Sequence, residues 1–186
     1  MKKRILTMTL AIVLLFALIP VGTEAASTAP ACVKKAAEKA MNESGIDVAF
    51  IVKLDKGCTG KGTAYMMYRD GSKVHCDRSG QVIVGRNTPI KKFYHYSFYR
   101  NPLSEKKVMS WKQNGIQYRQ RYTSNIECAE AACFNIFIHS YVEYKQNGSW
   151  QTCKGLSKNT DGMSMCKEFA RYLWSCADPD CPVVFM

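Results

Sequence analysis

The residues best able to do chemistry in this chain are its nine cysteines and three histidines. A catalytic thiol needs a cysteine beside a histidine and a further group that orients the pair. His75 and Cys76 are sequence neighbours, but neighbouring residues of a strand point to opposite faces, so neither can serve the other. Cys133 and His139 make no better pair. A thiol-dependent enzyme therefore stays an alternative without named catalytic residues.

Other catalytic and metal-binding patterns are missing from the sequence. No two cysteines have CxxC spacing, and the histidines are too scattered to complete a tetrahedral zinc site. There is no GxSxG elbow of a serine hydrolase, no P-loop and no GxGxxG motif. The sequence therefore favours a protein without a metal, a cofactor or catalytic residues.

The first 25 residues have the pattern of a secretory signal peptide. Basic residues at positions 2–4 precede an apolar run over Ile5–Ile19, and Pro20 and small residues ending at Ala25 follow. The run is shorter than the roughly 20 residues of a bilayer-spanning helix. We therefore expect Met1–Ala25 to be removed and residues 26–186 to form a single secreted or otherwise extracytoplasmic domain, without a transmembrane span.

In an exported chain, cysteines usually form disulfides. Nine is an odd number, so four bonds leave one thiol that is buried, reactive or bonded to another chain, and the last would give a disulfide-linked dimer. We expect Cys166 to bond to Cys153 or Cys133, and Cys176 can reach Cys181 across a turn. The full pairing stays open among Cys32, Cys58, Cys76, Cys128, Cys133, Cys153, Cys166, Cys176 and Cys181.

Basic residues outnumber acidic ones by 26 to 15, which gives a net charge of +11. Loss of the signal segment leaves +9, so the excess belongs to the domain. This charge predicts an anionic partner, such as an acidic glycan or lipid headgroups, while export argues against dedicated nucleic-acid binding. The expected surface-binding residues belong to a predicted basic hairpin. Lys106 and Lys107 come just before its first strand, and Arg119 and Arg121 lie on its second strand.

An aromatic segment, Lys91–Arg100 (KKFYHYSFYR), is expected to be a central strand. With period two, one face carries Phe93 and Tyr99, and the other carries three more rings. One face must belong to the core, and the second either lies under a helix or loop or lines a concavity for an apolar ligand. The candidate ligand-binding residues are Tyr94, Tyr96, Phe98 and Arg100.

The other elements follow from periodicity and turn residues. A helix is expected over Ala31–Ser44, ended by Gly45. Asp70-Gly71 and Ser79-Gly80 are expected to be turns between short strands, and Asn114-Gly115 is the strongest hairpin signal. The strands of the first half are expected at 46–54, 63–68, 73–76 and 81–84.

The second half is expected to contain more strands and a last helix. Residues 108–113 and 116–122 flank the Asn-Gly turn, and Ser124–Cys133 is expected to be a helical connection. Strands 134–144 and 149–153 follow, with a second turn between them at Asn147-Gly148. A helix over Gly162–Cys176 carries an apolar stripe, and Cys181 holds the tail. The fold class is therefore α+β: an antiparallel meander of about eight strands, as a curved sheet or half-barrel, with a helix at each end and disulfide stabilisation.

Two resemblances bear on function. Gln81-Val82-Ile83-Val84-Gly85 resembles the QxVxG loop of the cystatins, which implies a wedge loop that inhibits papain-like proteases. The layout is also similar to half-barrel carriers of lipids or lipoproteins, for which Met66, Met67 and Met109 would suit a deformable apolar pocket.

We expect a secreted, non-enzymatic binding protein for an apolar or amphiphilic ligand, an anionic surface or a partner protein. A cysteine-protease inhibitor and a thiol-dependent enzyme are the alternatives.

Overall fold

The computed structural model describes residues 28–57, 59–86, 88, 90, 96–99, 108–128, 136–153, 162–176 and 180–186. Within these ranges the chain forms two helices, α2 (Ala31–Ser44) and α3 (Lys167–Cys176). The strands are β1 (Val48–Leu54), β2 (Gly60–Asp70), β3 (Lys73–Val84), β4 (Tyr96–Tyr99), β5 (Val108–Gln113), β6 (Ile116–Arg121), β7 (Ser124–Cys128), β8 (Ile136–Ser140), β9 (Glu143–Gln146), β10 (Ser149–Thr152), β11 (Met163–Met165) and β12 (Pro182–Phe185).

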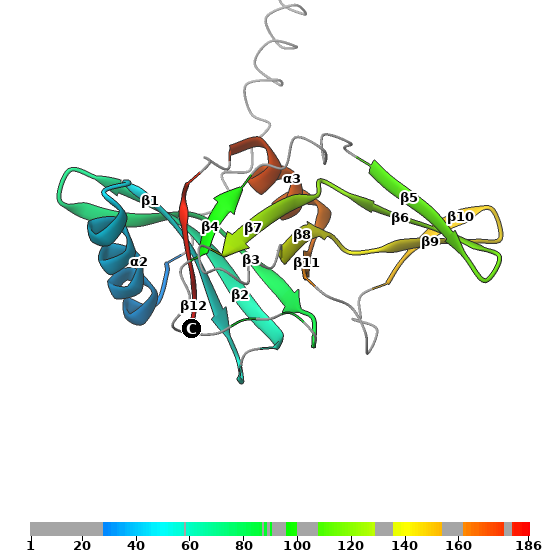
Figure 1. Cartoon of the computed structure of the whole chain (residues 1–186), viewed down its shortest axis with the longest axis horizontal. Coiled ribbons are helices and arrows are strands. Elements are labelled where there is room, and N and C mark those ends of the chain that lie inside the picture. Colours follow the sequence, from blue (N-terminus) through cyan, green and yellow to red (C-terminus); the bar gives the residue numbers. More distant parts are fainter. Residues whose placement is uncertain are drawn as a thin grey trace, which may run out of the picture.

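Eight of these strands close into a barrel in the order β1-β12-β4-β7-β8-β11-β3-β2 (Figure 1). Two neighbouring pairs, β1 with β12 and β8 with β11, run parallel, and the others run antiparallel. The predicted mixture of mainly antiparallel strands and two helices is confirmed. The sheet is closed rather than a half-barrel, and closure pairs the edges that an open sheet would expose.

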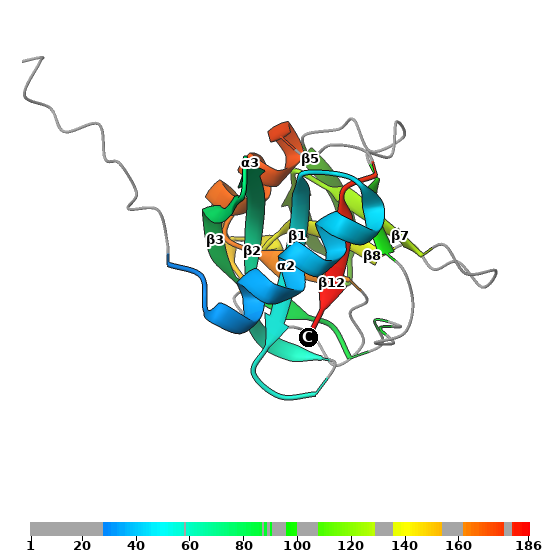
Figure 2. The ribbon, with the colours of Figure 1, turned by 90° about the vertical axis from the view of Figure 1, so that its left-hand side faces the viewer.

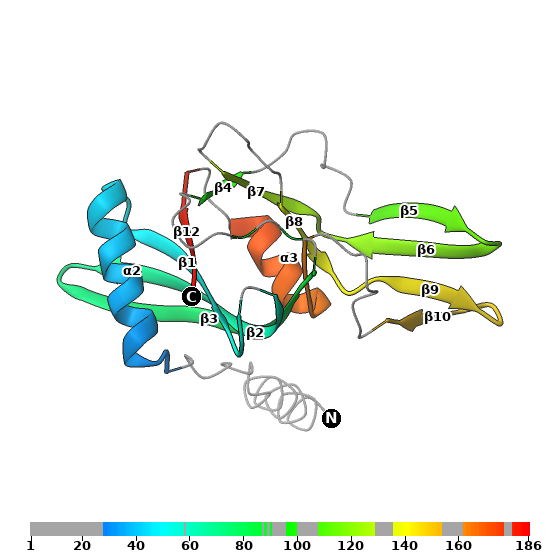
Figure 3. The same ribbon diagram turned by 60° about the horizontal axis from the view of Figure 1, so that its bottom comes forward.

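The other four strands form a second sheet in the order β10-β9-β6-β5, which we call the projecting sheet. It extends from the barrel at the end of the molecule opposite α2 (Figures 1 and 3). Only two residues separate β6 from β7, and only two separate β8 from β9. The projecting sheet therefore continues two barrel strands beyond the barrel wall.

Side chains fill the barrel interior, as is usual for a barrel of this size. α3 contributes to the same apolar cluster as the strands. The cluster includes Phe50, Met66, Phe98, Ile126, Ile138, Phe169, Ala170 and Leu173.

Outside the barrel, α2 covers β1 and its neighbours β12 and β2 (Figure 2). Val33, Ala37 and Met41 of the helix pack with Ala49 and Ile51 of β1. β1 is thus buried on both faces, which explains its nearly uninterrupted apolar sequence.

Local turn chemistry predicted several elements correctly. The helix over Ala31–Ser44 is confirmed, and Gly45 ends it in the left-handed region with φ of 73°. Asn114-Gly115 has φ values of 49° and 79°, and Asn147-Gly148 has values of 48° and 79°. Consecutive positive φ values are typical of the tight turns of β-hairpins.

The expected turn at Ser79-Gly80 is wrong, because both residues lie inside β3. Gly80 faces α3, and a Cβ atom placed there would lie 2.6 Å from Cδ1 of Phe169. The glycine therefore permits close packing of a helix against a strand, which is a second common use of glycine in sheets.

Three further expectations are corrected. Ser124–Cys128, expected to be helical, is β7, and Met163–Met165, expected to begin the last helix, is β11. The tail contains β12, which pairs with β1 and β4 and was not predicted. Each is a short run whose structure depends on neighbours that are distant in sequence, so periodicity alone does not identify it.

No disulfide joins any two cysteines whose side chains the structure describes: Cys32, Cys76, Cys153, Cys166, Cys176 and Cys181. The expected bonds Cys153–Cys166 and Cys176–Cys181 are therefore not formed. Cys58, Cys133 and the side chain of Cys128 lie outside the described part of the chain.

The predicted signal segment, Met1–Ala25, also lies outside the described residues. Neither helix within those residues is long and apolar enough to cross a membrane. Export of a single domain over 26–186 stays a prediction.

Candidate functional site

The projecting sheet separates its charged residues from its uncharged ones. Opposed residues on paired antiparallel strands share a face, and the register places Ser110 opposite Arg119 and Arg119 opposite Glu143. Every charged residue of these four strands lies on this side, which we call the charged face. It comprises Val108, Ser110, Lys112, Gln117, Arg119, Arg121, Glu143, Lys145, Trp150 and Thr152.

The opposite side, which we call the uncharged face, combines aromatic rings with amides. Trp111 lies opposite Tyr118, which lies opposite Tyr144, which lies opposite Gln151. These four positions form one row across all four strands. The face comprises Met109, Trp111, Gln113, Ile116, Tyr118, Gln120, Tyr144, Gln146, Ser149 and Gln151.

On the charged face, Glu143 holds two arginines in place. Arg119 donates to it twice, from Nε to Oε2 at 2.6 Å and from Nη2 to Oε1 at 3.2 Å, and Arg121 donates from Nε to Oε2 at 3.1 Å. Burial by itself would raise the pKa of Glu143, but the hydrogen bonds and positive charges of the arginines outweigh it and hold that pKa below its usual value. Glu143 is therefore ionised at neutral pH.

Trp150, on the edge strand β10, packs against Arg119 of β6 across the intervening strand β9. The Arg119 guanidinium carbon lies 3.8 Å from the centre of the Trp150 ring, which is a close cation–π contact. Because Arg119 is held by both Glu143 and Trp150, its orientation is fixed before any ligand arrives. A fixed guanidinium loses less side-chain entropy on binding an anion than a mobile one does.

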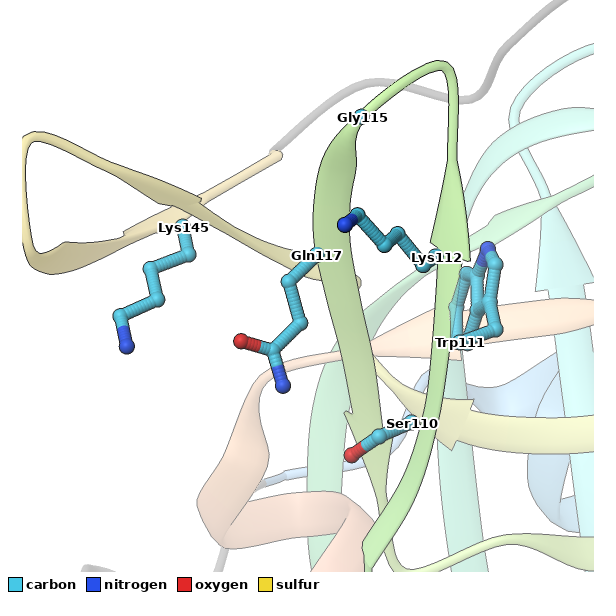
Figure 4. Close-up of a pocket in the computed structure, with 6 residues that line it drawn as sticks. All are labelled: Ser110, Trp111, Lys112, Gly115, Gln117 and Lys145. Carbon is cyan, nitrogen blue, oxygen red and sulfur yellow. The ribbon is translucent and has the colours of Figure 1, made fainter.

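Beside this network lies an open hollow of about 470 Å³, lined by Ser110, Trp111, Lys112, Gly115, Gln117 and Lys145. Figure 4 shows that Ser110, Gln117 and Lys145 project to one side of the sheet, while the Trp111 ring projects to the other. A hydroxyl, an amide and two ammonium groups therefore surround the hollow, and these groups suit an anion with several oxygen acceptors.

The two lysines of the hollow are exposed. Among the described residues, no carboxylate forms an ion pair with Lys112 or Lys145, whereas Glu143 is already shared by two arginines. The four basic residues and one glutamate leave a net charge of +3 on this face. Its positive charge is therefore only partly balanced within the sheet.

The expected surface-binding residues are only partly described. Arg119 and Arg121 lie on the charged face of β6, as the predicted basic hairpin requires. Lys106 and Lys107 lie outside the described residues.

The aromatic candidates occupy a different place. Phe98, which is 1% exposed, packs edge-on against Phe50 at 5.8 Å between ring centres, and Tyr96 packs against Phe185 at 5.2 Å. Both rings belong to the barrel core rather than to an open concavity. Tyr94 and Arg100 lie outside the described residues.

The segment that resembles a cystatin loop is not a loop. Gln81–Val84 belongs to β3 and pairs with β2 on one side and, over Val82–Val84, with β11 on the other. Val82 and Val84 are buried in the core, and only Gly85 lies beyond the strand. A protease wedge requires an exposed loop, so the structure removes the basis of that interpretation.

Cys176 and His139 do not have the properties that thiol catalysis needs. Burial raises the pKa of the Cys176 thiol, and hydrogen bonds with Tyr172 and Tyr68 only partly offset this, whereas a nucleophilic thiol needs a lowered pKa. His139 is buried, which lowers its pKa, and its Nδ1 donates to the backbone oxygen of Ser140 at 2.7 Å. Its neighbour in register on β11 is Ser164.

Sequence reasoning missed Glu143, which holds the two arginines, and also Trp111, Tyr118, Tyr144, Lys145 and Trp150. The available signal was the alternation of charged and uncharged residues on the two strand pairs around the Asn-Gly turns. What the sequence did not reveal is that β6 pairs with β9, which joins the two hairpins into one sheet.

Comparisons with known proteins give a likeness of fold. No family model matches the chain, and no curated protein matches it. A solved structure of a fused Zn-dependent amidase/peptidase/peptidoglycan-binding domain-containing protein from Clostridium acetobutylicum is 14% identical, with a TM-score of 0.51, over 86% of this chain and 64% of its own. A carbamoyl enzyme of Ldtfm with avibactam is also 14% identical, with a TM-score of 0.43, over 75% of this chain and 49% of its own. The chain thus spans less than two thirds of either structure.

Proposed function

We propose that this chain is a non-enzymatic binding protein that acts outside the cytoplasm and attaches to an anionic surface through the charged face of its projecting sheet. The observation that carries the proposal is the placement of all five charged residues of the four strands on one face, with a net charge of +3.

The charged face combines fixed and mobile cations. Arg119 and Arg121 are oriented by Glu143, while Lys112 and Lys145 are exposed on either side of the hollow. Oriented arginines favour defined hydrogen bonds to phosphate or carboxylate oxygens, and flexible lysines adapt to an irregular array of charges. A surface that bears many anionic groups would use both.

An apolar ligand is less well supported. The side chains that would line an internal pocket fill the barrel instead, among them Phe50, Met66 and Phe98. We therefore favour the anionic-surface form of the expected binding function over the amphiphile-carrier form.

Export and disulfide stabilisation belong to the same proposal. Nine cysteines follow the predicted signal segment, and an oxidising compartment would let the cysteines outside the described residues form bonds.

The test is binding to phosphatidylglycerol vesicles and, separately, to soluble alginate, at low and high salt. Each basic residue near an anionic lipid surface contributes about 1 kcal/mol, so Lys112→Ala with Lys145→Ala should cost about 2 kcal/mol, or about 30-fold in vesicle affinity. High salt should weaken binding as well, because it screens exposed charges.

The matched control is Lys34→Ala with Lys35→Ala. These lysines are also exposed, but they lie on α2 at the opposite end of the molecule (Figure 1). The control should keep most of the affinity. Failure of the wild-type chain to bind either probe, or an equal loss in the control, would contradict the proposal, and the two probes distinguish a lipid from a polysaccharide source of anions.

A further inference from the structure

We infer that the uncharged face of the projecting sheet is a second binding site, which takes a neutral saccharide chain. This goes beyond the anionic surface proposed above, because it uses the opposite side of the same sheet and different chemistry.

The row of Trp111, Tyr118, Tyr144 and Gln151 is the centre of the site. The Trp111 and Tyr118 rings are stacked on each other, with an interplanar angle of 13° and 5.7 Å between their centres. β5 and β10 are the two edge strands of the sheet, so the row runs from one edge to the other. Four strands about 4.8 Å apart make it about 14 Å long, which matches roughly three pyranose units.

Amides flank the aromatic row on the same face. Gln120 lies beside Met109, with 3.6 Å between Nε2 and Sδ, and Gln113 lies opposite Ile116. Gln146 and Gln151 add two more amides. A glutamine side chain has two N–H donors and one carbonyl acceptor. Gln113, Gln146 and Gln151 are exposed, whereas Nε2 of Gln120 already donates to Oγ1 of Thr123 at 3.3 Å.

This combination fits a sugar and not an ion. A pyranose ring has apolar C–H faces that stack on aromatic rings, and a rim of hydroxyls that both donate and accept hydrogen bonds. Tryptophan and tyrosine provide large, rigid, amphipathic contact areas, while a few placed polar groups set orientation. The face has no charged residue that would favour an anion or a cation.

The face is open to solvent. Met109, Trp111 and Ile116 are 39%, 38% and 41% exposed, which is high for large apolar residues. A row that reaches both edges of the sheet also leaves room for a polymer to continue past it. We therefore expect binding to an internal stretch of a chain rather than to its end.

Two other occupants fit less well. A second copy of the chain would bury four glutamine amides, and amides buried without partners cost free energy. An anionic lipid surface would meet no cation here, because all cations of the four strands lie on the opposite face.

The test is calorimetric titration of the full domain with cellohexaose, chitohexaose and maltohexaose. At least one should bind, with an affinity that salt does not change, and its trisaccharide should bind more weakly. Trp111→Ala should lower the affinity at least tenfold, and Gln151→Ala, on the exposed edge strand, should lower it severalfold. Thr152→Ala is the matched control, because Thr152 follows Gln151 on the same edge strand and is exposed but faces the other way, and it should bind as the wild type does.

Intrinsic fluorescence gives an independent readout, since Trp111 and Trp150 lie on opposite faces. The saccharide should change the emission of Trp150→Phe, which keeps Trp111 and Trp174, and should leave that of Trp111→Phe, which keeps Trp150 and Trp174, unchanged. The inference is overturned if none of the three hexasaccharides binds, if Thr152→Ala loses as much affinity as Gln151→Ala, or if the chain forms a dimer that Trp111→Ala dissociates and saccharide does not. Loss of vesicle binding alone would overturn only the proposed function of the charged face.

Discussion

The barrel and the projecting sheet are made of connected strands but differ in what their side chains contact. In the barrel, β1 is buried on both faces, between the interior cluster and α2. In the projecting sheet, every residue of β5 is exposed, and its neighbours are stabilised by contacts across the strands. The difference indicates that the barrel residues maintain the fold, whereas the residues of the projecting sheet are available for recognition.

Isolated hairpins are only marginally stable in water, and a sheet of three or more strands needs an apolar face or other packing. Here the cross-strand pairs replace a core. Trp111 with Tyr118 covers one face, and Arg119 with Glu143 and Trp150 covers the other. The groups that hold the sheet together are therefore close to the groups proposed to bind ligands.

The largest expected effect is a difference in stability between variants of the barrel and variants of the projecting sheet. Phe98→Ala removes a fully buried ring from the barrel and should lower the free energy of unfolding by about 3–5 kcal/mol. Trp111→Ala removes one ring of the exposed Trp111–Tyr118 pair and should lower the free energy of unfolding by only about 1 kcal/mol. Urea unfolding of both variants measures this. Equal losses would mean that the sheet and the barrel share one core, contrary to the comparison.

A smaller effect should come from the contact of α3 with the barrel. Gly80→Ala places a Cβ atom 2.6 Å from Phe169, so it should cost about 1–3 kcal/mol through overpacking. The cost should shrink when Phe169→Leu is introduced with it, because a smaller side chain leaves room for the new methyl group. Thermal unfolding of the two single variants and the double variant checks this. A penalty that is the same in both backgrounds would contradict packing as its cause.

How much the sequence could predict depended on the range of the interactions involved. Asn114-Gly115 and Asn147-Gly148 identified both hairpins, because positive φ values are set locally. The same reasoning failed at Ser79-Gly80. There the glycine is needed because Phe169, a residue far along the chain, packs too close for a Cβ atom. Short strands such as β7 and β12 become strands only by pairing with distant neighbours.

The candidate site was predictable only in part for the same reason. Arg119 and Arg121 were identified from local charge, but their partner Glu143 lies on another hairpin. The division into a charged and an uncharged face exists only once Tyr118 pairs with Tyr144. The aromatic stretch was expected to have one core face, but the sequence did not say which, and Tyr96 and Phe98, chosen as ligand-binding candidates, lie in the core.

The smallest expected effect on stability comes from the charged face. One substitution there should change the free energy of unfolding and the vesicle affinity in opposite directions. Glu143→Gln removes the carboxylate that orients Arg119 and Arg121, and it should lower the free energy of unfolding by about 1 kcal/mol, because the pair is only partly buried. The pKa of Glu143 lies below its usual value in the folded state. Its contribution is therefore fully present above the unfolded pKa of about 4.3 and is lost as the pH falls through the lower, folded pKa.

The difference in stability between wild type and Glu143→Gln should thus be constant at neutral pH and shrink in acid, whereas Glu38→Gln, an exposed carboxylate on α2, should change little. Binding should respond in the opposite sense. Removing the negative charge raises the net charge of the face from +3 to +4, which should strengthen binding to phosphatidylglycerol vesicles by about 1 kcal/mol. The loss of arginine orientation should offset part of this gain. The affinity should therefore rise by roughly threefold to fivefold at low salt. A variant that lost stability and vesicle affinity together would show that a rigid arrangement of the arginines, rather than the net charge of the face, determines binding.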